Sequence, residues 1–253
     1  MAPPLAVVLA AGRGTRMGSD LPKVLAVAAG KTLLDWVLEA LAAAGVADRV
    51  VVVGYRGDMV ERSVAGIAGV TTVQQREQRG TGDAVAAAAD EIRARLSVAE
   101  GPMPVVVVCG DSPMLRPESL RGLLDAFASN SASCILGTAR AANPEGLGRI
   151  VRHSDGRFAR IVEDKDASPE ERTIDEVNMS TYIFDAADLL WALGQIGTDN
   201  GSGEYYLTDC PSLLTAKGAA VEANACLDPS ETLSVNTPTQ LAEVDAALRR
   251  RTR

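Results

Sequence analysis

Residues 5 to 23 read LAVVLAAGRGTRMGSDLPK, and this stretch joins a short apolar run to a loop rich in glycine and basic side chains. The run Leu5–Ala10 has the length of a strand and is apolar on both faces, as buried parallel strands are. Gly12 and Gly14 follow it directly. A strand that leads through a glycine-rich turn toward a helix places backbone N–H groups where they bind phosphate. The stretch therefore predicts an α/β fold with a phosphate-binding loop after its first strand.

The first half of the chain continues this alternation of apolar runs and helix-like segments. Its predicted strands span residues 5–10, 49–54 and 104–111, and its predicted helices span residues 32–45, 81–96 and 119–130. The run from Val105 to Val108 is again apolar on both faces, and the helices have the length of crossover connections. The pattern predicts a Rossmann-like, doubly wound sheet.

Strand signals lie closer together from about Ser131 onward. Further strands are predicted at residues 131–139, 147–153, 157–164 and 176–184, and helices at residues 168–172, 186–196, 204–218 and 237–251. Asp155-Gly156 is a turn signal between two of these strands, and hairpin-like pairing makes the predicted sheet mixed. In the first of the helices, Ser168 is the expected cap and Pro169 stands in the first turn.

Composition limits the class of protein. The 253 residues include 25 basic and 33 acidic side chains, which gives a formal net charge of −8. Hydrophobic residues make up 47% of the chain. This acidic balance argues against broad binding to nucleic acid or anionic membranes. The sequence contains no candidate membrane span, and its first residues lack the basic segment of a signal peptide. We therefore expect a single cytoplasmic domain over residues 1–253.

Cysteine and histidine usage narrows the chemistry further. The four cysteines include no C-x-x-C pair, so the sequence indicates neither a zinc site nor a disulfide framework. The single histidine, His153, lies in a turn-like HSDG segment, where a solvated turn residue is expected. Chemistry that depends on histidine is therefore not expected.

The glycine-rich loop fits three classes of phosphate-binding motif to different degrees. A dinucleotide fingerprint needs G-x-G-x-x-G, but the third glycine here comes one residue too late, and no register supplies a Walker A loop. The string LAAGRGTRM followed by LPK resembles the signature of sugar nucleotidyltransferases. In that signature the glycines let the backbone approach a triphosphate, while Arg16 and Lys23 supply cations for charge on phosphate oxygens. The alternative is a tight turn with solvated basic residues.

This signature implies attack of a sugar 1-phosphate on the α-phosphorus of a nucleoside triphosphate, with release of pyrophosphate. Because the nucleophile is already an anion, the reaction needs a metal ion and positioning but no general base. Asp111 closes the apolar run 104–111, and Asn236 precedes the last predicted helix. Their oxygens suit Mg²⁺, although each residue alone also fits a turn or a helix start.

A second polar segment, QQREQRGTGDA, contains a candidate base-reading side chain. Gln75 can donate to and accept from the imide edge of a pyrimidine, and Gly80-Thr81 leads into a predicted helix N-terminus. The alternative for this segment is a polar loop capped by Thr81.

Taken together, these strings resemble the uridyltransferase domain of the bifunctional N-acetylglucosamine-1-phosphate uridyltransferase/glucosamine-1-phosphate acetyltransferase family. The resemblance covers essentially the whole chain and rests on LAAGRGTRMGSDLPKVL, EQRGTGDA, GDSPML, GLGRIVR, IVEDKDAS, EVN, GEYYLTD and VNTPTQL, in the family's order. It implies the nucleotide-diphospho-sugar transferase (GT-A-like) fold. It also implies Mg²⁺-dependent synthesis of UDP-N-acetylglucosamine from UTP and N-acetylglucosamine 1-phosphate.

The resemblance further implies roles for individual residues. The nucleotide would be bound by Ala11, Gly12, Gly14, Gln75, Gly80 and Thr81, the last three of them at uracil. The catalytic side chains would be Arg16 and Lys23, and the Mg²⁺ ligands Asp111 and Asn236. The sugar would contact Gly148, Glu163 and Asn178, with Glu204, Tyr206 and Thr208 nearby. On sequence grounds alone, Glu163 would be a solvated charge.

The chain departs from the family pattern at three places. Cys109 stands where the family has a tyrosine before Gly-Asp, and Met179-Ser180 stands where it has Thr-Gly, so we expect a reshaped sugar pocket. The family's hexapeptide-repeat β-helix is expected to be absent, which predicts one activity and leaves the oligomeric state open. Two alternatives remain: the same chemistry on glucose 1-phosphate or another sugar phosphate or nucleotide, and a non-catalytic subunit that senses sugar nucleotides.

Overall fold

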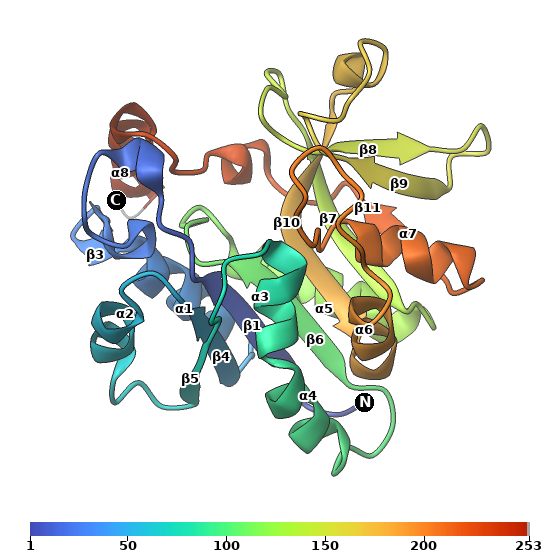
Figure 1. Cartoon of the computed structure of the whole chain (residues 1–253), viewed down its shortest axis with the longest axis horizontal. Coiled ribbons are helices and arrows are strands. Elements are labelled where there is room, and N and C mark those ends of the chain that lie inside the picture. Colours follow the sequence, from blue (N-terminus) through green and yellow to red (C-terminus); the bar gives the residue numbers. More distant parts are fainter. Residues whose placement is uncertain (252–253) are drawn as a thin grey trace.

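A nine-stranded mixed sheet crosses the part of the chain that the structure, a computed structural model, describes, residues 1–251 (Figure 1). Its main strands pair in the order β11-β7-β10-β6-β1-β4-β5, and β8 and β9 extend from β10. The bounds are β1 Leu5–Ala10, β4 Asp48–Val53, β5 Val70–Gln74, β6 Pro104–Cys109, β7 Cys134–Arg140, β8 Arg149–Arg152, β9 Phe158–Val162, β10 Glu176–Asp185 and β11 Val221–Asn224. The predicted first strand, β1, lies between β4 and β6 and is parallel to both.

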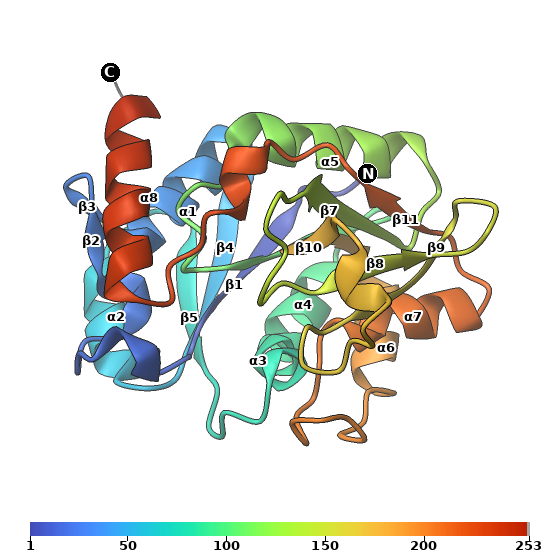
Figure 2. The same ribbon diagram turned by 90° about the horizontal axis from the view of Figure 1, so that it is seen from above.

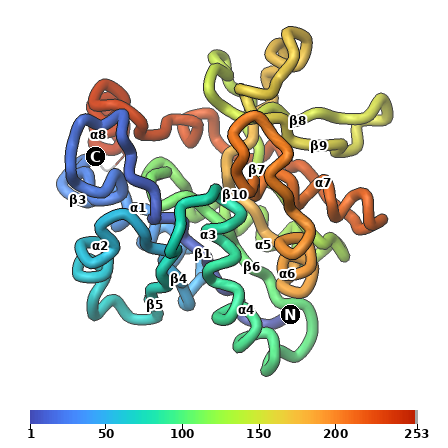
Figure 3. The backbone as a smooth tube through the Cα atoms, viewed as in Figure 1, coloured from blue at the N-terminus to red at the C-terminus, as the bar shows by residue number. Residues whose placement is uncertain are grey.

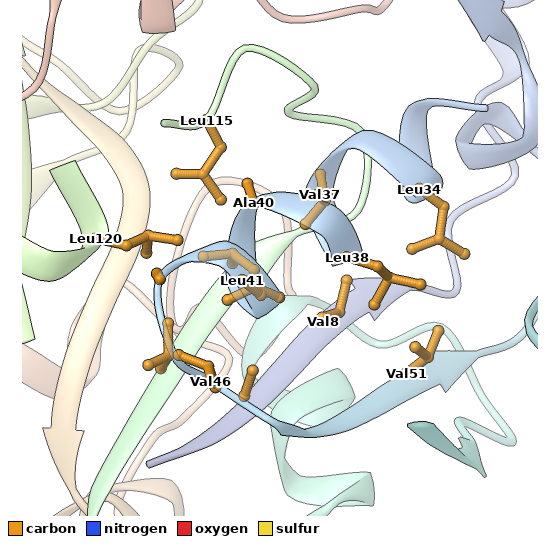
Figure 4. Packing of buried hydrophobic residues seen from close by; sticks show 14 of the residues in the cluster. Val8, Leu34, Val37, Leu38, Ala40, Leu41, Val46, Val51, Leu115 and Leu120 are labelled. Carbon is orange, nitrogen blue, oxygen red and sulfur yellow. The ribbon is translucent and has the colours of Figure 1, made fainter. Parts of the chain in front are cut away.

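Helices cover both faces of this sheet, as the doubly wound pattern predicted (Figure 2). One face carries α1 (Leu33–Ala43), α2 (Gly57–Val64) and α5 (Pro117–Ser129); the other carries α3 (Thr81–Ala87), α4 (Ala89–Leu96), α6 (Ala186–Leu193) and α7 (Asp209–Ala216). Val8 joins the first core and Val7 the second. Figure 4 shows Leu38 and Leu41 of α1 packed over Val8 and Val51. Burial on both faces explains why these strands are continuous apolar runs.

The second half of the chain supplies the antiparallel part of the sheet. β10 runs antiparallel to β6, β7 and β8, and β8 pairs with β9 around the Asp155-Gly156 turn. The predicted mixed sheet is therefore confirmed. Two strands of this nine-stranded sheet, β5 and β11, were not predicted, because both are short edge strands that are only partly buried and lack a continuous apolar run.

Three of the predicted helices differ from the structure. The segment 81–96 is two helices, α3 and α4, because the backbone at Ala88 leaves helical geometry with φ −89° and ψ 4°. The segment 168–172 holds only the 3-10 helix η3 (Glu171–Thr173), although the Ser168 hydroxyl does accept from the Glu171 N–H at 3.2 Å. In the segment 204–218 the helix begins only at Asp209. The short helix α2 was not predicted.

The glycine-rich loop leads into a helix by a longer route than the sequence indicated. After β1 the chain passes through two 3-10 turns, η1 (Thr15–Met17) and η2 (Lys23–Leu25), and the small hairpin of β2 (Val27–Ala28) and β3 (Lys31–Thr32), before α1 begins. The Thr32 hydroxyl then caps α1 by accepting from the Asp35 N–H at 3.0 Å.

The last helix, α8 (Pro238–Arg251), returns to the beginning of the chain. It follows the 3-10 helix η4 (Pro229–Thr232) and packs in a third core, where Val244 and Leu248 join Leu33 and Trp36. In Figure 3 the red helix α8 lies beside the blue segment that contains β3, away from the N-terminus. This packing places the segment before α8 beside the glycine-rich loop. No helix in residues 1–251 has the length and apolar character to cross a membrane.

Candidate functional site

A cavity of about 460 Å³ opens at the carboxyl ends of β1 and β6. Its wall includes eleven of the residues that the sequence analysis singled out: Ala11, Gly12, Gly14, Arg16, Lys23, Gln75, Gly80, Thr81, Asp111, Glu204 and Asn236. In open α/β sheets, ligands bind in the crevice outside the carboxyl ends of the strands, where the strand order reverses. The sheet reverses at β1, since β4 and β5 follow on one side and β6 on the other.

The two loop glycines have different physical reasons for being glycine. Gly14 has a φ of +63°, and a Cβ placed on it would lie 2.6 Å from Cβ of Lys23. Its lack of a side chain therefore allows both the left-handed turn and the close approach of Lys23. A Cβ on Gly12 would meet nothing within 4 Å. The backbone at Gly12 thus faces open space in the cavity wall, as a phosphate cradle requires.

Two cationic side chains and two side-chain oxygens lie close together at the end of the cavity between β1 and β6. Lys23 Nζ forms an ion pair with Asp111 Oδ2 and donates a hydrogen bond to Asn236 Oδ1 at 3.0 Å. Arg16 Nη2 donates to the same oxygen at 3.1 Å. The side chains of Lys23 and Asp111 are 15% and 20% exposed, so the pair is shielded yet open to the cavity. Three separate segments of the chain meet here.

The oxygens in this cluster fit a divalent cation. Asp111 Oδ2 and Asn236 Oδ1 converge on one positive charge, the Lys23 ammonium, which shows that both can face the same cation. A carboxylate and an amide oxygen are donors that Mg²⁺ accepts, and Mg²⁺ commonly keeps water and substrate phosphate as its other ligands. Within residues 1–251, no three His, Cys, Asp or Glu side chains gather into a metal-binding group.

The candidate base-reading residues form another part of the cavity wall. Gln75 is buried and its Nε2 donates to Gly80 O at 3.2 Å and to Asp83 Oδ2 at 2.8 Å. Thr81 Oγ1 accepts from the Leu207 N–H at 3.0 Å, which ties the segment after Glu204 to this part of the wall. Gly80 has a φ of +121°, and a Cβ there would lie 2.4 Å from Tyr205 O.

A second, smaller cavity of about 150 Å³ adjoins the first. The two share Cys109, Asp111 and Asn236 in their walls, and the smaller one adds Ser112, Leu147, Asn178, Met179, Ser180, Glu231, Thr232 and Ser234. Asn178 is held on both sides, since its Nδ2 donates to Tyr182 Oη at 2.6 Å and its backbone N–H to Gly148 O at 2.8 Å. Of the residues predicted to bind sugar, Asn178 lies in the wall of this smaller cavity.

The departures from the family pattern fall at this junction. Ser180 adopts a φ of +49°, which is unusual for a residue with a side chain, and β10 shifts register between Asn178 and Thr181. The Ser180 hydroxyl bonds to Cys109, whose thiol pKa burial raises to about 12, with the Asp111 charge acting in the same direction. Cys109 is therefore a neutral thiol at physiological pH.

Four other predicted sugar residues lie outside the walls of these two cavities. Glu163 Oε1 accepts from Thr208 Oγ1 at 3.0 Å, and burial raises the pKa of the Glu163 carboxyl. Within residues 1–251 the buried hydroxyl of Tyr206 has no hydrogen-bond partner. The Gly148 carbonyl oxygen accepts from the Asn178 N–H at 2.8 Å. Glu204, predicted to lie near the sugar, is in the wall of the larger cavity.

Sequence reasoning missed several residues of the site. Arg13 and Gln78 line the larger cavity, and the Arg13 guanidinium lies 5.2 Å from the centre of the Tyr55 ring. Asp83 Oδ2 accepts a hydrogen bond from the Gln75 side-chain amide. Arg13 and Asp83 both stand inside quoted motifs, so the motifs themselves were a signal. Their partners become visible only in the folded chain.

Three comparisons with known proteins bear on this site. Residues 6–171 match the family described as MobA-like NTP transferase domain. "Bifunctional protein GlmU" of Geobacter metallireducens is 46% identical over 246 residues, which cover 97% of this chain and 50% of that protein. The protein of the same name from Lactococcus lactis subsp. cremoris SK11 is 42% identical and is covered to 52%. This chain thus spans about half the length of these curated relatives.

One solved structure supports the fold. The structure entitled "The Crystal Structure of UDP-glucose pyrophosphorylase complexed with UDP-glucose" superimposes with a TM-score of 0.78, covering 99% of this chain and all of the other, at 18% identity. At that identity the likeness shows the fold alone. It confirms the expected GT-A-like nucleotidyltransferase fold.

Proposed function

We propose that this chain, which belongs to the family of MobA-like NTP transferase domains, transfers uridylyl from UTP to N-acetylglucosamine 1-phosphate and releases pyrophosphate. The GlmU relatives confirm the resemblance that the sequence predicted. The observation that carries the proposal is the convergence of Arg16, Lys23, Asp111 and Asn236 on one end of a cavity whose wall includes a glycine-rich loop.

In the proposed reaction an oxygen of the sugar phosphate attacks the α-phosphorus of UTP in line. A new P–O bond forms, the bond from the α-phosphorus to the bridging oxygen breaks, and pyrophosphate leaves with that electron pair. The nucleophile needs no base, which agrees with a site that contains no histidine in its walls among residues 1–251. The backbone around Gly12 and Gly14 cradles the triphosphate, and Arg16 and Lys23 stabilise charge that grows on its oxygens.

We propose Mg²⁺ as the cation at Asp111 and Asn236. When bound, Mg²⁺ supplies neutralisation of phosphate charge and alignment of the two substrates. The ion pair and hydrogen bond of Lys23 to these residues keep their oxygens turned toward the cavity. Lys23 thereby holds the ligand set together in addition to contacting phosphate.

We further propose that the sugar binds in the smaller cavity, between Asn178 and the cationic cluster. The amide and hydroxyl groups there, from Asn178, Ser180 and Ser234, suit the hydroxyl and acetamido groups of a sugar. Met179 and Ser180 replace the Thr-Gly of the family. The identity of the sugar is therefore the part of the proposal that most needs an experimental test.

Pyrophosphate release with and without Mg²⁺ tests the proposal. UTP, dTTP, CTP and ATP are crossed with the 1-phosphates of N-acetylglucosamine, glucosamine, glucose and galactose. Release confined to UTP with N-acetylglucosamine 1-phosphate and Mg²⁺ is the expected result. Release with glucose 1-phosphate instead would keep the chemistry and change the sugar, and silence in every pair would overturn the enzymatic proposal.

A further inference from the structure

We infer that Asp83 determines which pyrimidine the cavity accepts, by fixing the orientation of the Gln75 side-chain amide; the inference rests on the proposed function of the same cavity. Gln75 lines the cavity and is 3% exposed, while Asp83 lies behind it in the first turn of α3. Because Gln75 is buried, a wrongly turned amide would leave polar atoms without partners and is strongly disfavoured.

Two acceptors surround a single atom of the Gln75 amide. That atom lies 2.8 Å from Asp83 Oδ2 and 3.2 Å from Gly80 O. A carboxylate and a backbone carbonyl accept hydrogen bonds and donate none, so the atom between them must be the NH₂ nitrogen. Both N–H groups of that nitrogen are then engaged by the protein. The Oε1 acceptor is the atom of the amide that is left for a base in the cavity.

Asp83 is itself held in place on its other side. The Arg79 Nη2 atom lies 3.3 Å from Asp83 Oδ1, and the Arg79 guanidinium stacks 5.5 Å from the centre of the Tyr205 ring. One carboxylate oxygen of Asp83 therefore faces Gln75 and the other faces Arg79. Asp83 is a positioning residue, since it acts on the base through Gln75.

The fixed amide orientation has a consequence for the base. An Oε1 acceptor is complementary to the N3–H donor of uracil, whereas cytosine presents a lone pair at N3 and would face a second acceptor there. Like acceptors in contact cost binding, and they reject a substrate more effectively than a missing contact does. The cavity should therefore bind uridine nucleotides in preference to cytidine nucleotides, with Asp83 maintaining the difference.

Asp83→Asn tests this role, because asparagine is nearly the same size but can donate as well as accept. Affinities for UTP and CTP are measured by calorimetry without Mg²⁺, so that binding is observed independently of turnover. We expect the preference of Asp83→Asn for UTP over CTP to fall about tenfold or more relative to wild type. Asp90→Asn, an exposed carboxylate on the neighbouring helix α4, is the matched control and should keep the wild-type preference.

A double variant separates this role from a structural one. When Asp83→Asn is added to Gln75→Ala, the UTP/CTP preference should stay the same as in Gln75→Ala alone, because the residue through which Asp83 acts is gone. An equal loss of affinity for both nucleotides in Asp83→Asn would overturn the inference, as would a further change in the double variant. If wild type prefers UTP and the variant loses that preference but neither shows turnover, the inference stands while the proposed reaction fails. Binding of neither nucleotide by wild type would overturn both.

Discussion

Lys23 Nζ donates a hydrogen bond to Asn236 Oδ1 at 3.0 Å although 213 positions separate the two residues. The contact exists because α8 packs in the core that contains Leu33 and Trp36, beside the hairpin that follows the glycine-rich loop. The last helix thus completes the site that the first loop begins. Asp111 joins them from the end of β6, the strand next to β1.

The first prediction concerns Lys23. Lys23→Met should lower kcat about a hundredfold, because it removes a preorganised cation from the transition state, an effect that commonly costs about 3 kcal/mol. It also removes the partner that orients Asp111 and Asn236. Steady-state kinetics of pyrophosphate release measure the effect. Lys31→Met, which removes an exposed lysine paired with Glu39, should leave kcat unchanged; equal kinetics for the two variants would refute the role of Lys23.

The second prediction contrasts the two loop glycines. Gly14→Ala should destabilise the fold by about 1–2 kcal/mol, because alanine at φ +63° is strained and its Cβ would meet Lys23. Gly12→Ala should leave stability within about 0.5 kcal/mol, since its Cβ meets nothing, yet raise the KM for UTP about tenfold by filling phosphate space. Urea unfolding and UTP titrations measure both. The reverse ranking in stability, or a Gly12→Ala variant with unchanged KM, would contradict this account of the loop.

Part of the fold and of the site was predictable from the sequence. The strands with both faces buried were predicted because each reads as a continuous apolar run, and the quoted loop residues do line one cavity. The break at Ala88 was not predictable, because Ala86–Ala89 is a uniform alanine run with no local stop signal. The edge strand β5 was not predictable either, because its sequence VTTVQ is half exposed and contains no continuous apolar run.

The contacts inside the site were predictable to a lesser degree. Asp111 and Asn236 were named from their places after a strand and before a helix, but their meeting at Lys23 depends on how α8 packs. The grip of Asp83 on Gln75 depends on side-chain geometry that no spacing rule encodes. The left-handed backbone conformation of Ser180 could not be predicted from the sequence either, since serine has no preference for a positive φ.

The third prediction is a pH dependence at Glu163. Burial raises the pKa of this carboxyl, so the folded chain holds its proton to a higher pH than the unfolded chain does. The stabilisation from the protonated form is complete below the unfolded pKa and is lost as pH rises through the folded pKa. Glu163→Gln stays neutral and can still accept from Thr208, so it should gain stability relative to wild type at pH 7.5 and less at pH 4.

Urea unfolding at the two pH values measures this difference. The exposed Glu145→Gln is the control and should show little change with pH. A Glu163→Gln variant that is less stable than wild type at pH 7.5, or equally shifted at both pH values, would show that the buried charge is compensated.

The fourth prediction concerns thiol reactivity. With a pKa of about 12, Cys109 is a thiolate in only about one molecule in ten thousand at pH 8, and the thiolate is the species that iodoacetamide alkylates. Cys226 is exposed. Alkylation at pH 8 followed by peptide mass spectrometry should therefore find Cys226 modified before Cys109. Faster modification of Cys109 would mean that the cationic cluster activates its thiol instead of leaving it neutral.

The most direct test of the central claim follows the phosphorus atoms by ³¹P NMR while the chain acts on UTP and N-acetylglucosamine 1-phosphate with Mg²⁺. The account predicts that the UTP signals decline in step with the appearance of UDP-N-acetylglucosamine and pyrophosphate in equal amounts, and that Lys23→Met slows both together. Unchanged spectra from a folded chain that still binds UDP-N-acetylglucosamine would contradict the account and identify a sensor of sugar nucleotides in place of an enzyme.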